Sequence, residues 1–141
     1  MSIIKAFDTA FKRKQSRGWD KIYVAVDIHD TIFRACYENI ETYEYFPSAM
    51  RALRMLTERR DVCLILWTSS FEDKIADYLK RFQSDKIVFD YVNENPEVTR
   101  TPLADFSRKF YINVGIDDHF GFDPEKDWKK VLIILRTNRE E

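Results

Sequence analysis

The sequence predicts an α/β fold, a Rossmann-like three-layer sandwich in which helices cover both faces of a parallel sheet. The first observation behind this prediction is that short apolar runs of strand length alternate with longer segments whose apolar residues recur at helical spacing. This alternation favours parallel strands joined by right-handed helical crossovers. The second is that the runs are apolar nearly throughout, as in strands covered on both faces. We expect five strands, at residues 21–27, 62–67, 87–92, 111–116 and 131–135.

Length and composition indicate one domain spanning residues 1–141, with an N-terminal helix within residues 1–18 and a core at residues 21–135. A net charge of −1 gives no whole-chain attraction to nucleic acid or membrane. No apolar stretch approaches the roughly 18–20 residues that span a bilayer, and the N-terminus lacks the features of a signal peptide. We therefore expect a cytoplasmic protein without a membrane partner. The two cysteines, Cys36 and Cys63, support neither a disulfide framework nor a zinc site.

The first half of the chain predicts two helices around the first strand. Residues 3–16 carry apolar side chains at helical spacing, and this helix should end near Arg17 and Gly18. Periodicity leaves open whether it packs on its own domain or on a second subunit, and the oligomeric state stays open with it. Residues 33–46 form a polar and aromatic connection. Pro47 suits the first turn of the next helix, whose buried stripe would be Ala49, Met50, Leu53 and Leu56.

The second half predicts a helix after the second strand, with Ser70 as its N-cap and Asp73 at the capping-box position. A loop should follow the third strand at residues 93–102, where Pro96 and Pro102 interrupt regular structure. A short helical turn is expected at residues 103–108. The apolar face of the helix after the second strand would be formed by Phe71, Ile75, Leu79 and Phe82.

Two of the predicted strands end in carboxylates. The first stops on Asp27, and the fourth stops on Asp117 and Asp118. If the first three strands wind outward and the chain then crosses back, the strand order is 3-2-1-4-5 and the switch point lies between strands one and four. The three carboxylates would then share one crevice at the carboxyl edge of the sheet. Carboxylate oxygens at such a site suit a hard cation and a phosphate.

The order of these motifs resembles that of the haloacid dehalogenase (HAD) superfamily over residues 21–135. In that family an apolar strand is followed by Asp-x-Asp-x-Thr, and here residues 27–31 read Asp-Ile-His-Asp-Thr. The family's second motif, a strand ending in Thr or Ser, corresponds to residues 64–68, which end in Thr68. Its third, a lysine before the fourth strand, corresponds to Lys109, with Arg108 and Lys86 as alternatives. Its fourth, a strand ending in paired acids, corresponds to residues 115–118.

The resemblance implies an Mg²⁺-dependent phosphomonoester hydrolase that acts through an aspartyl-phosphate on Asp27. It assigns Mg²⁺ to Asp27, to the backbone carbonyl of His29, and to an acid at Asp117 or Asp118, leaving open which of the two binds directly. Thr68, with Ser69, would bind the phosphoryl oxygens. Lys109 would bind substrate and neutralise developing negative charge.

His29 departs from the family pattern, because phosphatases of the family usually carry Asp two residues after the nucleophile. That Asp protonates the leaving oxygen and then deprotonates the attacking water. Imidazole can do both near neutral pH. Three outcomes follow from the substitution: a phosphatase that uses His29, a slow phosphatase, or a catalytically impaired relative that serves as a binding or interaction module.

The short segments between motifs indicate a capless member without a large cap domain, and hence an open site. Such a site suits a phosphorylated small molecule or nucleotide, or a nucleic-acid end. The basic run at residues 12–17 is a candidate contact for a phosphate backbone or a solvated helix face. Aromatic residues after the first motif either stack on a base or pack beneath a short flap; they are Phe33, Tyr37, Tyr43, Tyr45 and Phe46.

Overall fold

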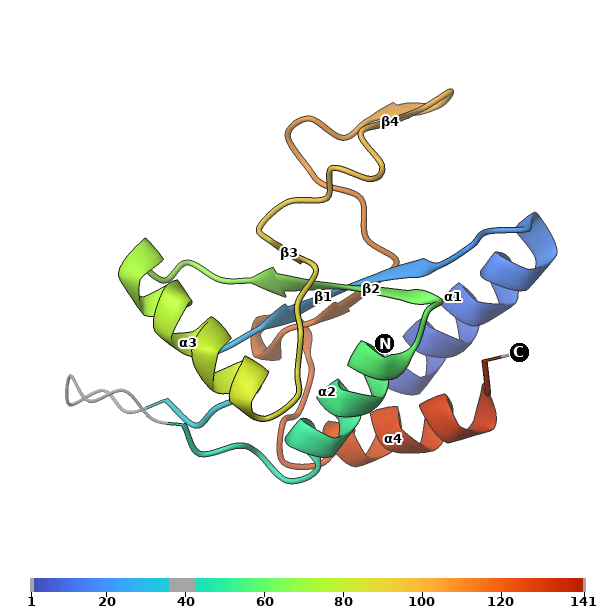
Figure 1. The fold of residues 1–141 in the computed structure, drawn as a ribbon. Coiled ribbons are helices and arrows are strands. Elements are labelled where there is room, and N and C mark those ends of the chain that lie inside the picture. The colour runs from blue at the N-terminus through green and yellow to red at the C-terminus, as the bar shows by residue number, and fades with distance from the viewer. Residues whose placement is uncertain (1, 36–42, 141) are drawn as a thin grey trace.

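A four-stranded parallel sheet forms the centre of the molecule (Figure 1). The structure is a computed structural model that describes residues 2–35 and 43–140. The strands are β1 (Ile22–Asp27), β2 (Val62–Trp67), β3 (Tyr91–Val92) and β6 (Val114–Ile116), in the order β3-β2-β1-β6. The predicted order of the first four strands is therefore confirmed, and the switch point lies between β1 and β6.

The four α-helices of the described residues contribute to one hydrophobic cluster, and α1, α2 and α4 lie beneath a single face of the sheet (Figure 1). They are α1 (Ile3–Arg17), α2 (Ala49–Glu58), α3 (Glu72–Ser84) and α4 (Asp127–Thr137). Alternate strand residues such as Val24, Val26 and Leu64 point into this cluster. Each helix supplies an apolar stripe to it, and these residues would cost about 1.5–3 kcal/mol each if they were left in water.

The opposite face of the sheet is covered differently from the prediction. Tyr23, Ala25, Cys63 and Ile65 point to this face and pack against side chains from the segment at residues 91–111. That segment contains a small antiparallel pair, β4 (Arg100–Thr101) with β5 (Ala104–Asp105), where a helical turn at residues 103–108 was expected. Among the described residues no helix covers this face, so the predicted three-layer sandwich is wrong on this side.

The predicted fifth strand at residues 131–135 is also wrong, because those residues lie within α4. Trp128, Val131, Leu132 and Leu135 are buried, while Ile133 is half exposed. This spacing is that of one helix face, and α4 packs against both α1 and α2. A strand would have turned alternate residues of the run away from the core.

The N-terminal helix packs on its own domain, which answers one question that periodicity left open. Phe7 is fully buried, and α1 contacts α4, β6 and β1. Ser2 accepts a hydrogen bond from the Lys5 N–H at the first turn, and Gly18 ends the helix in a left-handed conformation that glycine adopts without strain. In the basic run of this helix, Lys14 lies 3.6 Å from the carboxylate of Asp61.

Smaller differences concern the ends of elements. The N-cap of α3 is Phe71, whose side chain is 82% exposed, so Ser70 does not cap the helix and Phe71 is not part of its buried face. Pro47 lies just before α2, which begins at Ala49. The third and fourth strands are shorter than expected.

Among the described residues, none of the helices has the length and apolarity needed to cross a bilayer. Cys63 is a buried free thiol, and Cys36 lies outside the described residues.

Candidate functional site

A cleft of about 530 Å³ opens at the carboxyl edge of the sheet, over the switch point between β1 and β6. Its walls come from the segments that follow β1, β2, β3 and β6, which is where parallel α/β sheets bind ligands. Predicted and unpredicted residues line it together: Asp27, His29, Asp30, Trp67, Thr68, Ser69, Asn93, Asp117, Asp118 and His119.

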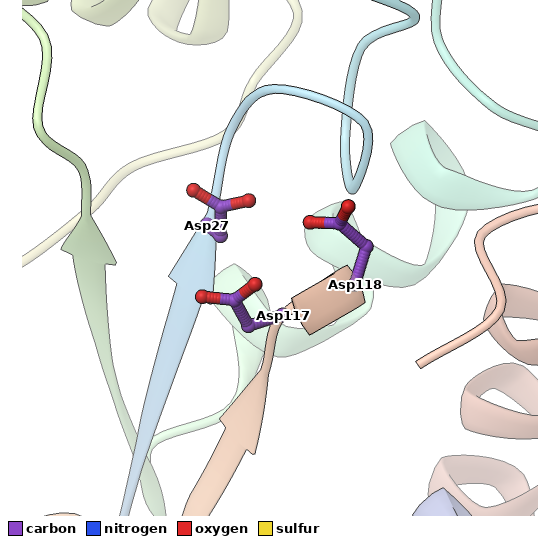
Figure 2. Close-up of side chains that lie close together, drawn as sticks. All are labelled: Asp27, Asp117 and Asp118. Atoms are coloured by element: carbon purple, nitrogen blue, oxygen red, sulfur yellow. The ribbon is translucent and has the colours of Figure 1, made fainter. Parts of the chain in front are cut away.

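Three carboxylates converge in this cleft (Figure 2). Asp27 is the last residue of β1, Asp117 follows β6, and Asp118 opens the short 3₁₀-helix η1 (Asp118–Phe120). One oxygen from each lies within 4.8 Å of the others. The parallel register that pairs Val26 with Ile116 places Asp27 beside Asp117, so the sheet itself brings the two chain segments together.

Asp27 titrates abnormally because of this position. Burial, and after it the neighbouring charge of Asp117, raise the pKa of Asp27 from 3.8 to about 7, although a hydrogen bond from Thr31 opposes the shift. A like charge held this close disfavours the ionised form of Asp27. A bound cation would reverse that effect and keep Asp27 ionised at neutral pH.

The oxygen arrangement fits a divalent cation. Octahedral coordination at about 2.1 Å places neighbouring ligand oxygens about 3 Å apart and opposite ones about 4.2 Å apart. Three oxygens within 4.8 Å of one another are compatible with those separations after small side-chain movements. The donor set is all carboxylate, which suits Mg²⁺, Mn²⁺ and Ca²⁺ and does not by itself distinguish among them.

Thr31 holds two of the carboxylates in place and was not assigned a role from the sequence. Its hydroxyl lies 3.0 Å from Asp27 Oδ2 and 3.1 Å from Asp118 Oδ1, and it accepts a hydrogen bond from the Asp118 N–H at 3.0 Å. The residue is fully buried, and its carbonyl accepts a hydrogen bond from Trp128 Nε1. In the sequence, Thr31 stands out only as the last residue of the first motif, residues 27–31. Its contacts with the two carboxylates depend on the folded structure.

His29 lies at the cleft with its ring fixed by α3. Its Nε2 is 2.7 Å from the hydroxyl of Tyr78, and the two rings meet edge to face. Tyr78 is almost fully buried, so it provides a firm anchor for an otherwise exposed imidazole. The predicted role of the His29 carbonyl as a metal ligand stays a prediction. Asp30 adopts a left-handed conformation, and its carboxylate accepts a hydrogen bond from the Ala35 N–H.

Thr68 lies in the cleft as predicted, and Asn93 determines its position. The Thr68 N–H donates to Asn93 Oδ1 at 2.8 Å, and Asn93 Nδ2 donates to the Thr68 carbonyl at 2.7 Å. This pair of bonds ties the end of β2 to the end of β3. The Thr68 hydroxyl donates a hydrogen bond to Ser70 Oγ at 3.0 Å. The exposed Ser69 also lines the cleft.

Lys109 is not brought into the site. It is exposed and is absent from the cleft lining, as are its alternatives Arg108 and Lys86. Its neighbour Phe110 packs on Trp67 beneath the cleft. Among the described residues that line the cleft, the side chains able to carry positive charge are His29 and His119.

The aromatic residues that were candidates for base stacking are packing residues in the structure. Phe33 is fully buried and Phe46 is 6% exposed. Tyr43 and Tyr45 pack against the same cluster, whereas Tyr37 lies outside the described residues. Among the described residues that line the cleft, the large aromatic side chain is instead Trp67, which was expected only as the last residue of the second strand.

Comparison with known proteins supports the fold alone. No family model matches the chain, and no curated protein matches it. Among solved structures, the chain is similar to a conserved protein from Bacteroides thetaiotaomicron, with a TM-score of 0.64 and 24% sequence identity. The match covers 85% of this chain and 93% of that chain. Function must therefore be argued from the site itself.

Proposed function

We propose that this protein is an Mg²⁺-dependent phosphomonoester hydrolase of the HAD type, with Asp27 as the nucleophile. The observation that carries the proposal is the convergence of Asp27, Asp117 and Asp118 at the switch point of the sheet, with Thr68 in the same cleft. An isolated acidic turn is common in proteins. Carboxylates from two separate strands held by a shared buried threonine are a more specific arrangement.

Asp27 would attack phosphorus and displace the alcohol, forming an aspartyl-phosphate that water then hydrolyses. Asp27, Asp117 and Asp118 would hold the Mg²⁺, which, when bound, offsets the repulsion between the anionic nucleophile and the phosphate. The Thr68 hydroxyl, which donates to Ser70 Oγ in the structure, would turn to donate to a phosphoryl oxygen. Its backbone is already fixed by Asn93, so little ordering is needed when substrate binds.

His29 would protonate the leaving oxygen and later take a proton from the attacking water. General acid–base help of this kind contributes roughly 10²–10⁴-fold in rate. The contact with Tyr78 fixes the imidazole without using Nδ1, so one ring nitrogen stays available for proton transfer. This supports the use of His29 in place of the family's second Asp.

The proposal is tested by measuring phosphate release from an aryl phosphate and from a panel of phosphomonoesters, with Mg²⁺ and with a chelator. We expect release that requires both the metal and Asp27, so that Asp27→Asn is inactive but folded. Asp20→Asn, an exposed acid outside the cleft, is the matched control and should retain activity. Undiminished release by Asp27→Asn would remove Asp27 as the nucleophile.

A second candidate function, a binding module that retains the fold without turnover, is favoured by one observation. The expected lysine is absent from the cleft lining, and no lysine or arginine is among the described residues that line the cleft. The variant His29→Asp separates the two functions. It should lower hydrolysis if His29 is a tuned acid–base group, and it should raise hydrolysis if the native protein is impaired at that position.

A further inference from the structure

Trp67 lies directly beside the proposed nucleophile. Strands β1 and β2 lie side by side (Figure 1), and their parallel register pairs Asp27 with Trp67 at the strand ends. Side chains alternate along both strands, so these two point to the same face as Ala25 and Ile65. This is the face that the helices leave uncovered. Trp67 also lines the cleft, and the residue as a whole is 43% exposed.

The indole is held in place by its surroundings. Phe110 packs against it with ring centroids 5.4 Å apart. The next residue along the chain, Thr68, is tied to Asn93 by two hydrogen bonds. The other five residues of β2 are buried. The strand therefore presents one large aromatic surface to the cleft, at a fixed position, and the described residues leave much of it open to a ligand.

We propose that Trp67 is a stacking platform for the base of a nucleotide whose phosphate is held at Asp27. This inference rests on the proposed function, because it uses Asp27 to place the phosphate. Neighbouring strands lie about 4.8 Å apart, and the register pairs Asp27 with Trp67, so one small molecule can place its phosphate at Asp27 and its base on the indole. A cleft of about 530 Å³ is large enough for a mononucleotide.

A nucleotide supplies both a phosphate for the carboxylates at Asp27 and a base that can reach the indole of Trp67. Stacking on tryptophan is tolerant of the identity of the base, so the platform selects a nucleotide over other phosphomonoesters without selecting one base.

Binding tests the platform separately from catalysis. Adenosine 5′-monophosphate and ribose 5-phosphate differ by the base, and their affinities can be measured by calorimetry with Mg²⁺ in the His29→Ala background, which slows turnover and keeps Asp27. We expect Trp67→Leu to weaken binding of adenosine 5′-monophosphate by about 5-fold to 150-fold, the range for loss of one stacked base. Binding of ribose 5-phosphate should be unchanged.

Two further variants keep the test informative. Trp67→Phe retains a ring and should retain most of the preference for adenosine 5′-monophosphate that Trp67→Leu loses. Trp19→Leu is the matched control, since Trp19 precedes β1 at the opposite edge of the sheet and lines no part of the cleft. Equal affinity of the two ligands in the protein with Trp67, or no binding of adenosine 5′-monophosphate, would overturn the platform.

Kinetics distinguishes failure of the platform from failure of the proposed function. Hydrolysis without preference for adenosine 5′-monophosphate over ribose 5-phosphate or phosphotyrosine would retain the phosphatase and remove the platform. A base-dependent affinity that requires Trp67, without hydrolysis, would retain the platform and favour the binding module. A 5′-phosphorylated dinucleotide provides one more comparison: tighter binding than the mononucleotide would identify a nucleic-acid end as the source of the base.

Discussion

At the scale of single residues, the buried hydroxyl of Thr31 organises the site. It contacts Asp27 and Asp118 and accepts a hydrogen bond from the backbone of Asp118. Because a hydroxyl has one hydrogen, it can donate to only one carboxylate at a time. The two acids are nevertheless held within reach of one cation. Partners of this kind fix the orientation of metal ligands and tune their affinity.

We predict that Thr31→Val weakens Mg²⁺ binding by about 10- to 100-fold, the usual effect of removing such a partner. Valine fills the same volume but leaves the carboxylates without the hydroxyl. Thr31→Ser keeps the hydroxyl and should bind Mg²⁺ nearly as well as the native protein. Calorimetric titration with MgCl₂ measures both. Equal affinity of all three proteins would show that the hydroxyl does not organise the site.

The role of His29 predicts a dependence on the leaving group. An alkoxide needs protonation as it leaves, whereas p-nitrophenolate does not. His29→Ala should therefore lower kcat for an alkyl phosphomonoester by roughly 10²–10⁴-fold and change kcat for p-nitrophenyl phosphate much less. Tyr78→Phe, which removes the anchoring hydroxyl, should show the same trend with a smaller amplitude. An equal loss on both substrates would assign His29 to binding and not to proton transfer.

At the scale of elements, the sequence predicted the strands and helices that have a strong local pattern. It did not predict the elements whose type depends on contacts with other elements. The strands β1 and β2 and the helix α1 have strong periodicity, and they formed close to their expected bounds. The run at residues 131–135 is too short for periodicity to separate a strand from a buried helix. Contacts of α4 with α1 and α2 decide in favour of the helix, and those contacts are not visible in the local pattern.

Just before β2, Arg59 forms an ion pair with Asp61 and also donates a hydrogen bond to the backbone near the end of α4. Arg59 donates through Nε and Nη2 to the two carboxylate oxygens of Asp61 at 2.8 and 2.9 Å, and through Nη1 to the Leu135 carbonyl at 3.2 Å. Both side chains of the pair are about 90% buried. Burial by itself would raise the pKa of Asp61, but the Arg59 guanidinium and Lys14 hold it below its ordinary value.

We predict that Asp61→Asn lowers the free energy of unfolding at pH 7 by about 3–5 kcal/mol, because it leaves a buried guanidinium without its counter-charge. Since the folded-state pKa is depressed, this contribution is complete above the unfolded value of 3.8 and is lost as the pH falls below it. Urea denaturation at pH 7 and at pH 3 measures the difference. Asp8→Asn, which breaks the exposed pair with Lys12, should cost less than about 1 kcal/mol.

At the scale of the whole molecule, the ionised form of Asp27 that the proposed function requires lowers the stability of the metal-free protein. Folding raises the pKa of Asp27 from 3.8 to about 7. Between these two pH values, Asp27 is therefore more fully protonated in the folded protein than in the unfolded chain. Stability of the metal-free protein should therefore fall as the pH rises from about 5 to about 8. The carboxylates with depressed pKa values already make their full contribution at the lower end of this interval, so they add no slope within it.

Thermal unfolding in chelator tests this linkage. We expect Tm to fall between pH 5 and pH 8, Asp27→Asn to remove most of the fall, and Mg²⁺ to raise Tm at pH 8 in proportion to the logarithm of its concentration once the site is saturated. A metal-free Tm that rises over the same interval would contradict the close approach of the carboxylates.

The topology of the sheet explains how much of the site could be predicted. Asp27, Asp117, Asp118 and Thr68 follow strands, so their meeting at one edge could be inferred from strand order. The roles of Asn93 and Trp67 could not be inferred in this way, because they depend on contacts between the ends of neighbouring strands. The contact of Tyr78 with His29 depends on how α3 packs. Lys109 was placed by family resemblance, and the segment that carries it covers a sheet face, so its side chain lies outside the cleft.

The most direct test of the central claim is to trap the covalent intermediate. Borohydride reduces an aspartyl-phosphate to homoserine, which tandem mass spectrometry can locate in the chain. With Mg²⁺ and a phosphomonoester that the protein hydrolyses, we predict homoserine at position 27 and none when substrate is omitted. Sustained hydrolysis without homoserine at position 27, or with homoserine at another aspartate, would contradict the assignment of Asp27 as the nucleophile.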